Sequence, residues 1–137
     1  MRFFFKSKDG GSESNVVGYW LIESKKLFSI VILCFNRGSR EAFHSHAFNA
    51  ISWVISGRLD ECIKSKYGYR NQLILPSIKP IFTSRKRLHK VTGLVDKTWV
   101  ITFRGPWDNT WKEFFSKTNE EVTLTSGRKI VNKKALP

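Results

Sequence analysis

The sequence has few of the features that mark secreted or membrane-spanning chains. It contains two cysteines among 137 residues, Cys34 and Cys62, too few for a disulfide framework, which favours a reducing compartment. No apolar run approaches the roughly 18 residues of a membrane span. The three phenylalanines after Arg2 are too few for a signal-peptide core. We therefore predict a cytoplasmic protein without a membrane segment.

Several fixed-spacing motifs are also missing. We find no P-loop, no G-x-G-x-x-G and no zinc-finger spacing. Acidic residues are scarce, because 11 Asp and Glu against 24 Lys and Arg leave a net charge of +13. That balance favours an anionic partner, such as a nucleic acid, a nucleotide or an acidic metabolite. A basic surface alone does not establish a function, so the charge favours an anionic partner without identifying it.

Aromatic residues are abundant, with 11 Phe, 5 Trp and 3 Tyr. They lie in short apolar segments with turn signals between them, of which the clearest are residues 16–22, 27–35, 42–55, 58–63 and 98–103. This pattern predicts one all-β domain over residues 1–137, a sandwich or a barrel. One short helix is predicted at residues 109–117, where Trp111, Phe114 and Phe115 share a helical face. The basic segment 127–137 is predicted to fray.

The chain has three histidines, and two of them form an H-x-H pair, His44 and His46. Residues two apart in a strand face the same side, so both imidazoles can approach one metal ion. His89, on a neighbouring predicted strand, can complete the set. An isolated H-x-H pair is more often an exposed polar pair than a metal site, so the surrounding residues must distinguish the two.

Those surroundings resemble the first motif of the cupin superfamily. The motif is Gly, five residues, His-x-His, three or four residues, Glu, six residues, Gly; this chain has Gly38, His44 and His46, Ala50 and Gly57 at those positions. His89 lies where the second cupin motif supplies a histidine. The resemblance spans roughly residues 27–103 and implies a cupin β-barrel (a double-stranded β-helix). It also implies one divalent metal ion, Fe, Zn, Mn or Ni, held by the three histidines.

Ala50 departs from the motif, because the metal-binding glutamate is missing. Three alternatives stay open: a three-histidine site, a carboxylate supplied from elsewhere, or a barrel that has lost its metal. If Ser56 and Gly57 form a two-residue hairpin turn, Ser52 pairs with Glu61, which then points inward. Glu61 is therefore a candidate fourth ligand or acid/base residue, with a solvent-facing charge as the alternative.

One group of cationic residues surrounds His89, and a further arginine follows a later predicted strand. Arg85, Lys86, Arg87 and Lys90 would attract an anionic substrate if their loop lies at the barrel mouth, although a solvated basic loop is the alternative. Arg104 follows the predicted strand 98–103 and can clamp a carboxylate or phosphate with two hydrogen bonds. A surface arginine beside a turn is the alternative for Arg104.

The resemblance implies a metal-dependent enzyme with dioxygenase- or isomerase-type chemistry on a small anionic substrate. The alternatives are a non-catalytic cupin that binds or sequesters a nucleotide or acidic metabolite, and a nucleic-acid binder that uses charge and stacking. Cupins are often dimers, and the surplus of aromatic residues leaves room for a homodimer interface. The short basic chain is also similar in style to small proteins of tailed phages, which implies a host-cytoplasmic setting.

Overall fold

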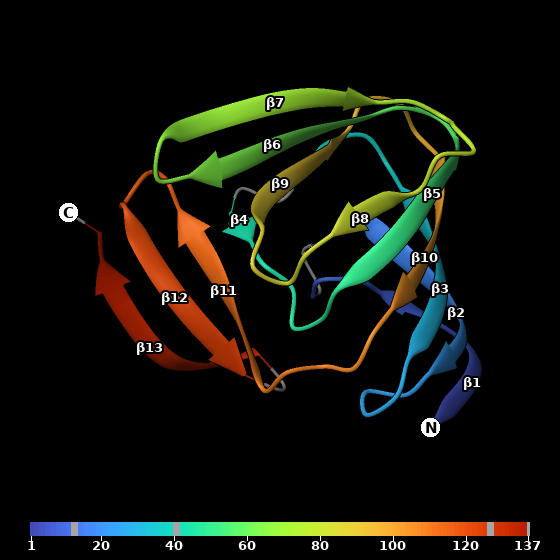
Figure 1. Ribbon diagram of the computed structural model, residues 1–137, viewed down its shortest axis with the longest axis horizontal. Helices are drawn as coiled ribbons and strands as arrows, with labels where there is room; N and C mark the ends of the chain where they lie inside the picture. Colours follow the sequence, from blue (N-terminus) through green and yellow to red (C-terminus); the bar gives the residue numbers. More distant parts are fainter. Residues whose placement is uncertain (12–13, 40–41, 126–127, 137) are drawn as a thin grey trace.

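The computed structural model describes residues 1–11, 14–39, 42–125 and 128–136, and these residues form two antiparallel sheets (Figure 1). The six-stranded sheet has the order β1 (Arg2–Lys8), β2 (Val16–Glu23), β3 (Ser29–Phe35), β10 (Thr98–Arg104), β5 (Ala50–Ser56), β8 (Ile81–Thr83). The seven-stranded sheet has the order β13 (Lys129–Ala135), β12 (Glu120–Thr125), β11 (Thr110–Phe115), β4 (Phe43–His44), β9 (Leu88–Gly93), β6 (Leu59–Ser65), β7 (Gly68–Ile74). The predicted all-β architecture is confirmed.

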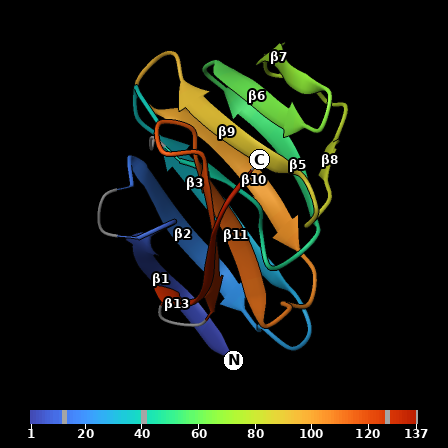
Figure 2. The ribbon, with the colours of Figure 1, turned by 90° about the vertical axis from the view of Figure 1, so that its left-hand side faces the viewer.

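The apolar core lies between the two sheets, which face each other in Figures 1 and 2. Side chains alternate along each strand, so every second residue points inward. The largest buried cluster takes members from both sheets: Val16, Trp20, Val31, Leu33, Val54, Leu59 and Val100. In the part of the chain that is described, no helix has the length and hydropathy that a membrane crossing requires.

The segment predicted as one long strand, residues 42–55, divides between the two sheets. Its start forms β4 in the seven-stranded sheet, and its end forms β5 in the six-stranded sheet. The predicted hairpin at Ser56 and Gly57 is wrong, because β5 pairs with β10 and β8 whereas β6 pairs with β7 and β9. The chain instead crosses from one sheet to the other at Gly57.

Both glycines of the sequence motif have backbone angles that favour glycine. Gly38 has a φ of 105° and Gly57 a φ of 93°, which side chains with a Cβ rarely adopt. At Gly57 a Cβ would also overlap Thr98 of the neighbouring strand. The motif spacing therefore reflects two backbone turns that position β4 and β5.

The helix predicted at residues 109–117 is not present, and β11 occupies most of that segment. β11 pairs with β12 on one side and with β4 on the other, so its backbone hydrogen bonds are made in the sheet. The consecutive residues Glu113 and Phe114 are both buried: Glu113 binds Arg128, and Phe114 packs against Phe43. The helical spacing of Trp111 and Phe114 was therefore coincidental, and the sheet overrides it.

The segment predicted to fray also differs from expectation. Residues 129–135 form β13, an edge strand paired with β12. All seven side chains of β13 are exposed, and ion pairs such as Lys133 Nζ to Glu120 Oε2 (3.3 Å) link it to its neighbour. Lysines on an edge strand discourage pairing with other chains. Residues 127 and 137 lie outside the described part of the chain.

Candidate metal centre

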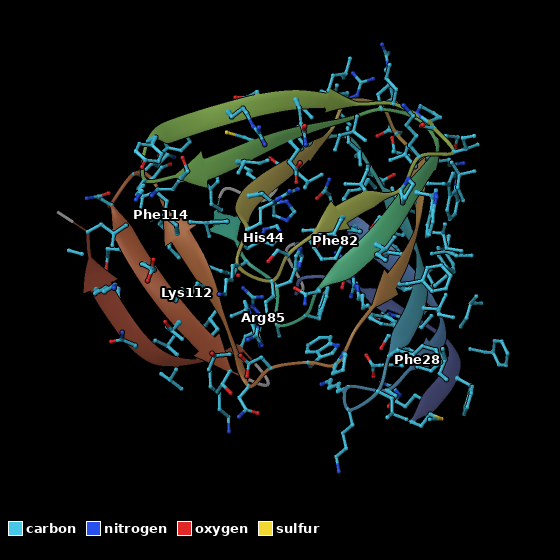
Figure 3. All side chains as sticks on the ribbon, viewed as in Figure 1. Phe28, His44, Phe82, Arg85, Lys112 and Phe114 are labelled. Atoms are coloured by element: carbon cyan, nitrogen blue, oxygen red, sulfur yellow. The ribbon has the colours of Figure 1, made fainter. Side chains whose placement is uncertain are left out.

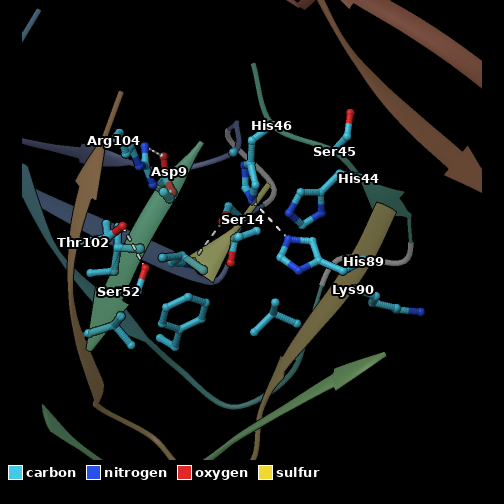
Figure 4. A pocket seen from close by; sticks show the side chains of 18 of the residues that line it. Asp9, Ser14, His44, Ser45, His46, Ser52, His89, Lys90, Thr102 and Arg104 are labelled. Atoms are coloured by element: carbon cyan, nitrogen blue, oxygen red, sulfur yellow. Dashed lines mark hydrogen bonds and ion pairs between the residues drawn. The ribbon is translucent and has the colours of Figure 1, made fainter. Parts of the chain in front are cut away.

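Three imidazoles converge in the cavity between the sheets (Figure 4). His44 ends β4 and is the register partner of His89 on β9. His46 follows two residues after His44, just beyond the strand. One ring nitrogen from each histidine lies within 4.8 Å of the others. The structure thus places together the three histidines that the sequence singled out.

The spacing of two of these nitrogens fits a shared cation. The Nε2 atoms of His46 and His89 are 3.0 Å apart, a distance that either a hydrogen bond or a common metal ion produces. Two imidazole nitrogens at about 2.1 Å from one ion and at right angles to each other lie about 3 Å apart. The donor set is three imidazoles, which suits Fe, Zn and Ni among the divalent ions.

Glu61 supports this cluster from behind. Its side chain is 2% exposed, and its Oε2 atom accepts a hydrogen bond from His89 Nδ1 at 2.6 Å. Gln72 donates a hydrogen bond to the other carboxylate oxygen, and Arg87 Nη1 lies 3.6 Å from Oε2. With Nδ1 of His89 engaged, the Nε2 atom of that ring faces the other two histidines.

The inward orientation predicted for Glu61 is correct, but the pairing that led to it is not. Glu61 pairs with Val91 of β9 and Gln72 of β7, not with Ser52. Glu61 was also predicted as a fourth metal ligand. In the structure its carboxylate instead binds Nδ1 of His89, the ring nitrogen that points away from the other two histidines. Glu61 is therefore placed as a positioning residue.

The Glu61 carboxyl is held in its charged form. Burial by itself would raise its pKa, but hydrogen bonds from His89 and Gln72 and the charges of His89 and Arg87 outweigh burial. The pKa of Glu61 therefore lies below its usual value. A carboxylate that stays ionised remains an acceptor for the Nδ1 proton of His89.

The cavity beside the imidazoles has a volume of about 310 Å³. Ala50 lines it, so the position where the motif has glutamate does face the interior, and it presents only a methyl group. On the same wall, Ser52 Oγ donates a hydrogen bond to Thr102 Oγ1 at 2.8 Å. Phe48 and Trp107 form part of the apolar lining.

Arg104 lies in the cavity wall but not at an open mouth. It is 4% exposed, and its Nη1 and Nη2 atoms donate to the two carboxylate oxygens of Asp9 at 3.2 and 2.7 Å. Its guanidinium also lies over the rings of Trp20 and Phe48, at 5.1 and 4.6 Å from their centroids. The two-pronged clamp predicted for a substrate is thus already filled by a carboxylate of the chain itself.

The basic residues around His89 point in different directions. Arg85 Nη1 binds Asp108 Oδ2 at 3.0 Å, and both side chains are exposed. Arg87 lies beside Glu61, whereas Lys90 lies over the Phe43 ring with its amine directed away from the imidazoles (Figure 4). Lys90 does line the cavity, but Arg85 and Arg87 do not.

Sequence reasoning missed several residues of the site. Asp9, Gln72 and Thr102 were not singled out, although Thr102 carried a signal: it is a polar residue at an inward position of an apolar strand. Arg128 also lines the cavity and binds Glu113, a contact between residues that gave no signal in the sequence.

Comparison with known proteins identifies the fold. No protein-family model matches the sequence, and no curated protein matches it. Among solved structures, a sugar phosphate isomerase of the cupin superfamily from Silicibacter pomeroyi is similar over 96% of this chain and 88% of its own, with a TM-score of 0.63 and 12% identity. KdgF from Halomonas sp. is similar over 77% of this chain and 94% of its own, with a TM-score of 0.56 and 14% identity.

A third similar structure is that of Fe(II) HppE, which matches 74% of this chain with a TM-score of 0.59 and 16% identity. The match covers 55% of the HppE chain, so this chain corresponds to about half of that protein. These similarities show that the chain has the cupin fold, as its sequence motif indicated.

Proposed function

We propose that this chain is a metal-dependent cupin enzyme that binds one divalent ion through His44, His46 and His89 and acts on a small anionic substrate. The observation that carries the proposal is the convergence of three imidazoles at the edge of a cavity of about 310 Å³. That volume is at the small end of the range of ligand sites in proteins. Two similar structures, an Fe(II) enzyme and a sugar phosphate isomerase, give further support.

The bound ion would supply Lewis acidity toward an oxygen of the substrate, in dioxygenase- or isomerase-type chemistry. The chain's own residues hold the ligands in place. Glu61 accepts the Nδ1 proton of His89 and so fixes which nitrogen of that ring faces the cavity. Phe48 and Trp107 give the same space part of its apolar lining.

Cationic groups support an anionic substrate. Lys90, Arg104 and Arg128 line the cavity, and the chain carries a net charge of +13. Because Arg104 is paired with Asp9, it serves as part of a fixed wall, and the overall positive field of the chain attracts the anion. Association of the substrate should therefore slow with added salt, since screening at physiological ionic strength acts over about 8 Å.

A non-catalytic cupin that binds a nucleotide or acidic metabolite is the second candidate. The observation in its favour is Ala50, which puts a methyl group where the sequence motif has a carboxylate ligand. In that case the cavity would still hold an anion, with or without the ion. Binding of nucleic acid through the basic surface is a third alternative, and binding of random DNA and RNA tests it.

The test uses untagged protein loaded in turn with Fe(II), Zn, Mn and Ni. Small carboxylates, sugar phosphates and nucleotides are screened by thermal shift, and each stabilising compound is then incubated and examined for products by mass spectrometry. The proposal predicts a product that forms only with metal and is lost in the variant His44→Ala/His46→Ala. Stabilisation without product would support the second candidate. Tight, salt-sensitive binding of random DNA or RNA without small-molecule stabilisation would overturn both.

A further inference from the structure

The lysines and arginines of the cavity wall differ in whether a ligand can reach them. Arg104 is 4% exposed, and both of its terminal nitrogens are engaged by Asp9. Lys90 directs its amine away from the imidazoles (Figure 4). Arg128 is the remaining lysine or arginine that lines the cavity in the described part of the chain. A negatively charged ligand therefore meets Arg128 as its accessible partner.

Arg128 lies where the cavity opens to solvent. Its side chain is 40% exposed, whereas every other described residue that lines the cavity is buried or half-buried. Its stem lies beside Gly11, because a Cβ built at Gly11 would be 3.4 Å from Arg128 Cδ. Gly11 belongs to the connection from β1 to β2, and Arg128 directly precedes β13, so the two sheets approach each other here. A side chain that is exposed and also lines the cavity connects the two environments.

Glu113 holds the guanidinium of Arg128 in position. Arg128 Nη2 donates a hydrogen bond to Glu113 Oε1, and the Glu113 side chain is 6% exposed. Glu113 is the register partner of His44, so the anchoring carboxylate is one strand away from the imidazole cluster. Figure 3 shows His44 between the two sheets, with β11, the strand of Glu113, next to it. Arg128 is thus anchored on the strand that adjoins the candidate metal ligands.

The guanidinium has the capacity to bind a second anion. It carries five N–H donors in one plane, and the hydrogen bond to Glu113 uses Nη2. Two N–H groups on one edge of a guanidinium match two oxygens of a carboxylate or a phosphate. Phe48 and Trp107 offer apolar surface to the carbon atoms of such a ligand. The geometry therefore favours a small oxyanion whose charged group is held at the opening.

We propose that Arg128 selects the ligand of this cavity by binding its carboxylate or phosphate group at the opening, with Glu113 as the positioning residue. This inference rests on the proposed function, because the ligand is the anionic substrate of that site. It assigns to one residue a selectivity for anions that the net charge of +13 gives only to the surface as a whole. A ligand held at Arg128 extends from the opening into the cavity beside the histidines.

The test is the affinity of two simple probes, inorganic phosphate and acetate, for the untagged chain in its metal-free and Zn-loaded forms. Binding is followed at constant ionic strength by NMR chemical shifts, including those of the arginine Nε–H groups. The Arg128 resonance is identified by its absence from Arg128→Gln, and at least one probe should shift it. Arg128→Gln should weaken binding of that probe about tenfold, the order expected for losing a hydrogen bond to a charged group. The probe that binds more tightly shows whether the ligand's charged group is a carboxylate or a phosphate.

Two further variants separate recognition by the guanidinium from the effect of charge. Arg58→Gln removes the same charge at an exposed arginine outside the cavity lining and should bind the probe as the wild type does. Arg128→Lys keeps the charge but loses the planar fork, so its affinity should fall between those of the wild type and Arg128→Gln. Circular dichroism shows whether each variant folds, and Arg128→Lys serves as the test if Arg128→Gln does not fold.

Wild-type affinity in folded Arg128→Gln overturns the proposal, and so does an equal loss in Arg58→Gln, which would show an effect of net charge alone. A wild type that binds neither probe overturns it as well. The metal stoichiometry of the same samples separates this inference from the proposed function. A chain that binds no metal but needs Arg128 for the probe contradicts the proposed function only. A chain that binds metal and does not need Arg128 for the probe contradicts this inference only.

Discussion

The two walls of the cavity carry different kinds of polar groups. The seven-stranded wall brings His44 and His89 together with a carboxylate behind them. On the six-stranded wall, Ser52 binds Thr102, and Arg104 binds a carboxylate of the same chain. Groups that satisfy each other within a wall give it shape and rigidity, whereas imidazoles that face a common point are the donor type that a divalent cation takes. The candidate metal ligands His44 and His89 thus belong to the seven-stranded wall, and the internally paired groups belong to the six-stranded wall.

The largest effect is expected from removing ligands of the seven-stranded wall. His44→Ala/His46→Ala should abolish the binding of a divalent ion, because a single imidazole of the three remains. Isothermal titration of the metal-free protein measures this. The matched change on the opposite wall, Ser52→Ala/Thr102→Val, should bind the ion with wild-type stoichiometry. Equal losses in both variants would break the distinction between the walls.

A smaller effect is expected from the carboxylate behind the ligands. Glu61→Gln should weaken metal affinity about 10- to 100-fold, the usual consequence of losing the acceptor that orients a ligating histidine. The control is Asp60→Asn, the adjacent residue on the same strand, whose carboxylate binds Asn71 outside the cavity. If Glu61→Gln binds metal as the wild type does, Glu61 does not position His89.

The six-stranded wall should respond in stability and not in metal binding. Asp9→Asn leaves the buried Arg104 guanidinium without its ionic partner and should lower the free energy of unfolding by about 1–3 kcal/mol. Urea unfolding of wild type and variant measures the difference, and the metal stoichiometry of the folded variant should be unchanged. If the folded Asp9→Asn variant lost its metal, the six-stranded wall would contribute directly to metal binding.

The smallest effect is expected at Arg87, which acts through Glu61. Arg87→Gln removes a positive charge 3.6 Å from the carboxylate, whereas the hydrogen bonds from His89 and Gln72 remain. Metal affinity should therefore fall less than in Glu61→Gln, by under about tenfold. The same calorimetric titration ranks the two variants. If Arg87→Gln lost more metal affinity than Glu61→Gln, Arg87 would not act through Glu61.

Local patterns in the sequence predicted the parts of the site that lie close together along the chain. The H-x-H pair and the motif glycines carried the resemblance to the cupin fold, and that resemblance predicted a cluster of His44, His46 and His89, whereas the alternation of apolar residues predicted only an all-β domain. The structure places all three there. These signals succeed because strand periodicity and positive φ angles are properties of short segments.

Features that depend on distant pairing could not be read from the sequence. Arg104 and Asp9 are 95 residues apart, so nothing local showed that the arginine already had a partner. The inward position of Glu61 was predicted from a hairpin that does not form, and the strands that actually orient it come from farther along the chain. The segment 109–117 had helical spacing, but pairing on both sides made it a strand.

The metal content of the wild-type chain purified without a histidine tag shows whether the seven-stranded wall holds a cation. Inductively coupled plasma mass spectrometry of the protein after dialysis against metal-free buffer and reloading with one divalent ion at a time gives the stoichiometry. We expect one ion per chain in the wild type and none in His44→Ala/His46→Ala. A wild-type chain that retains no ion, or a double variant that retains a full equivalent, would contradict it.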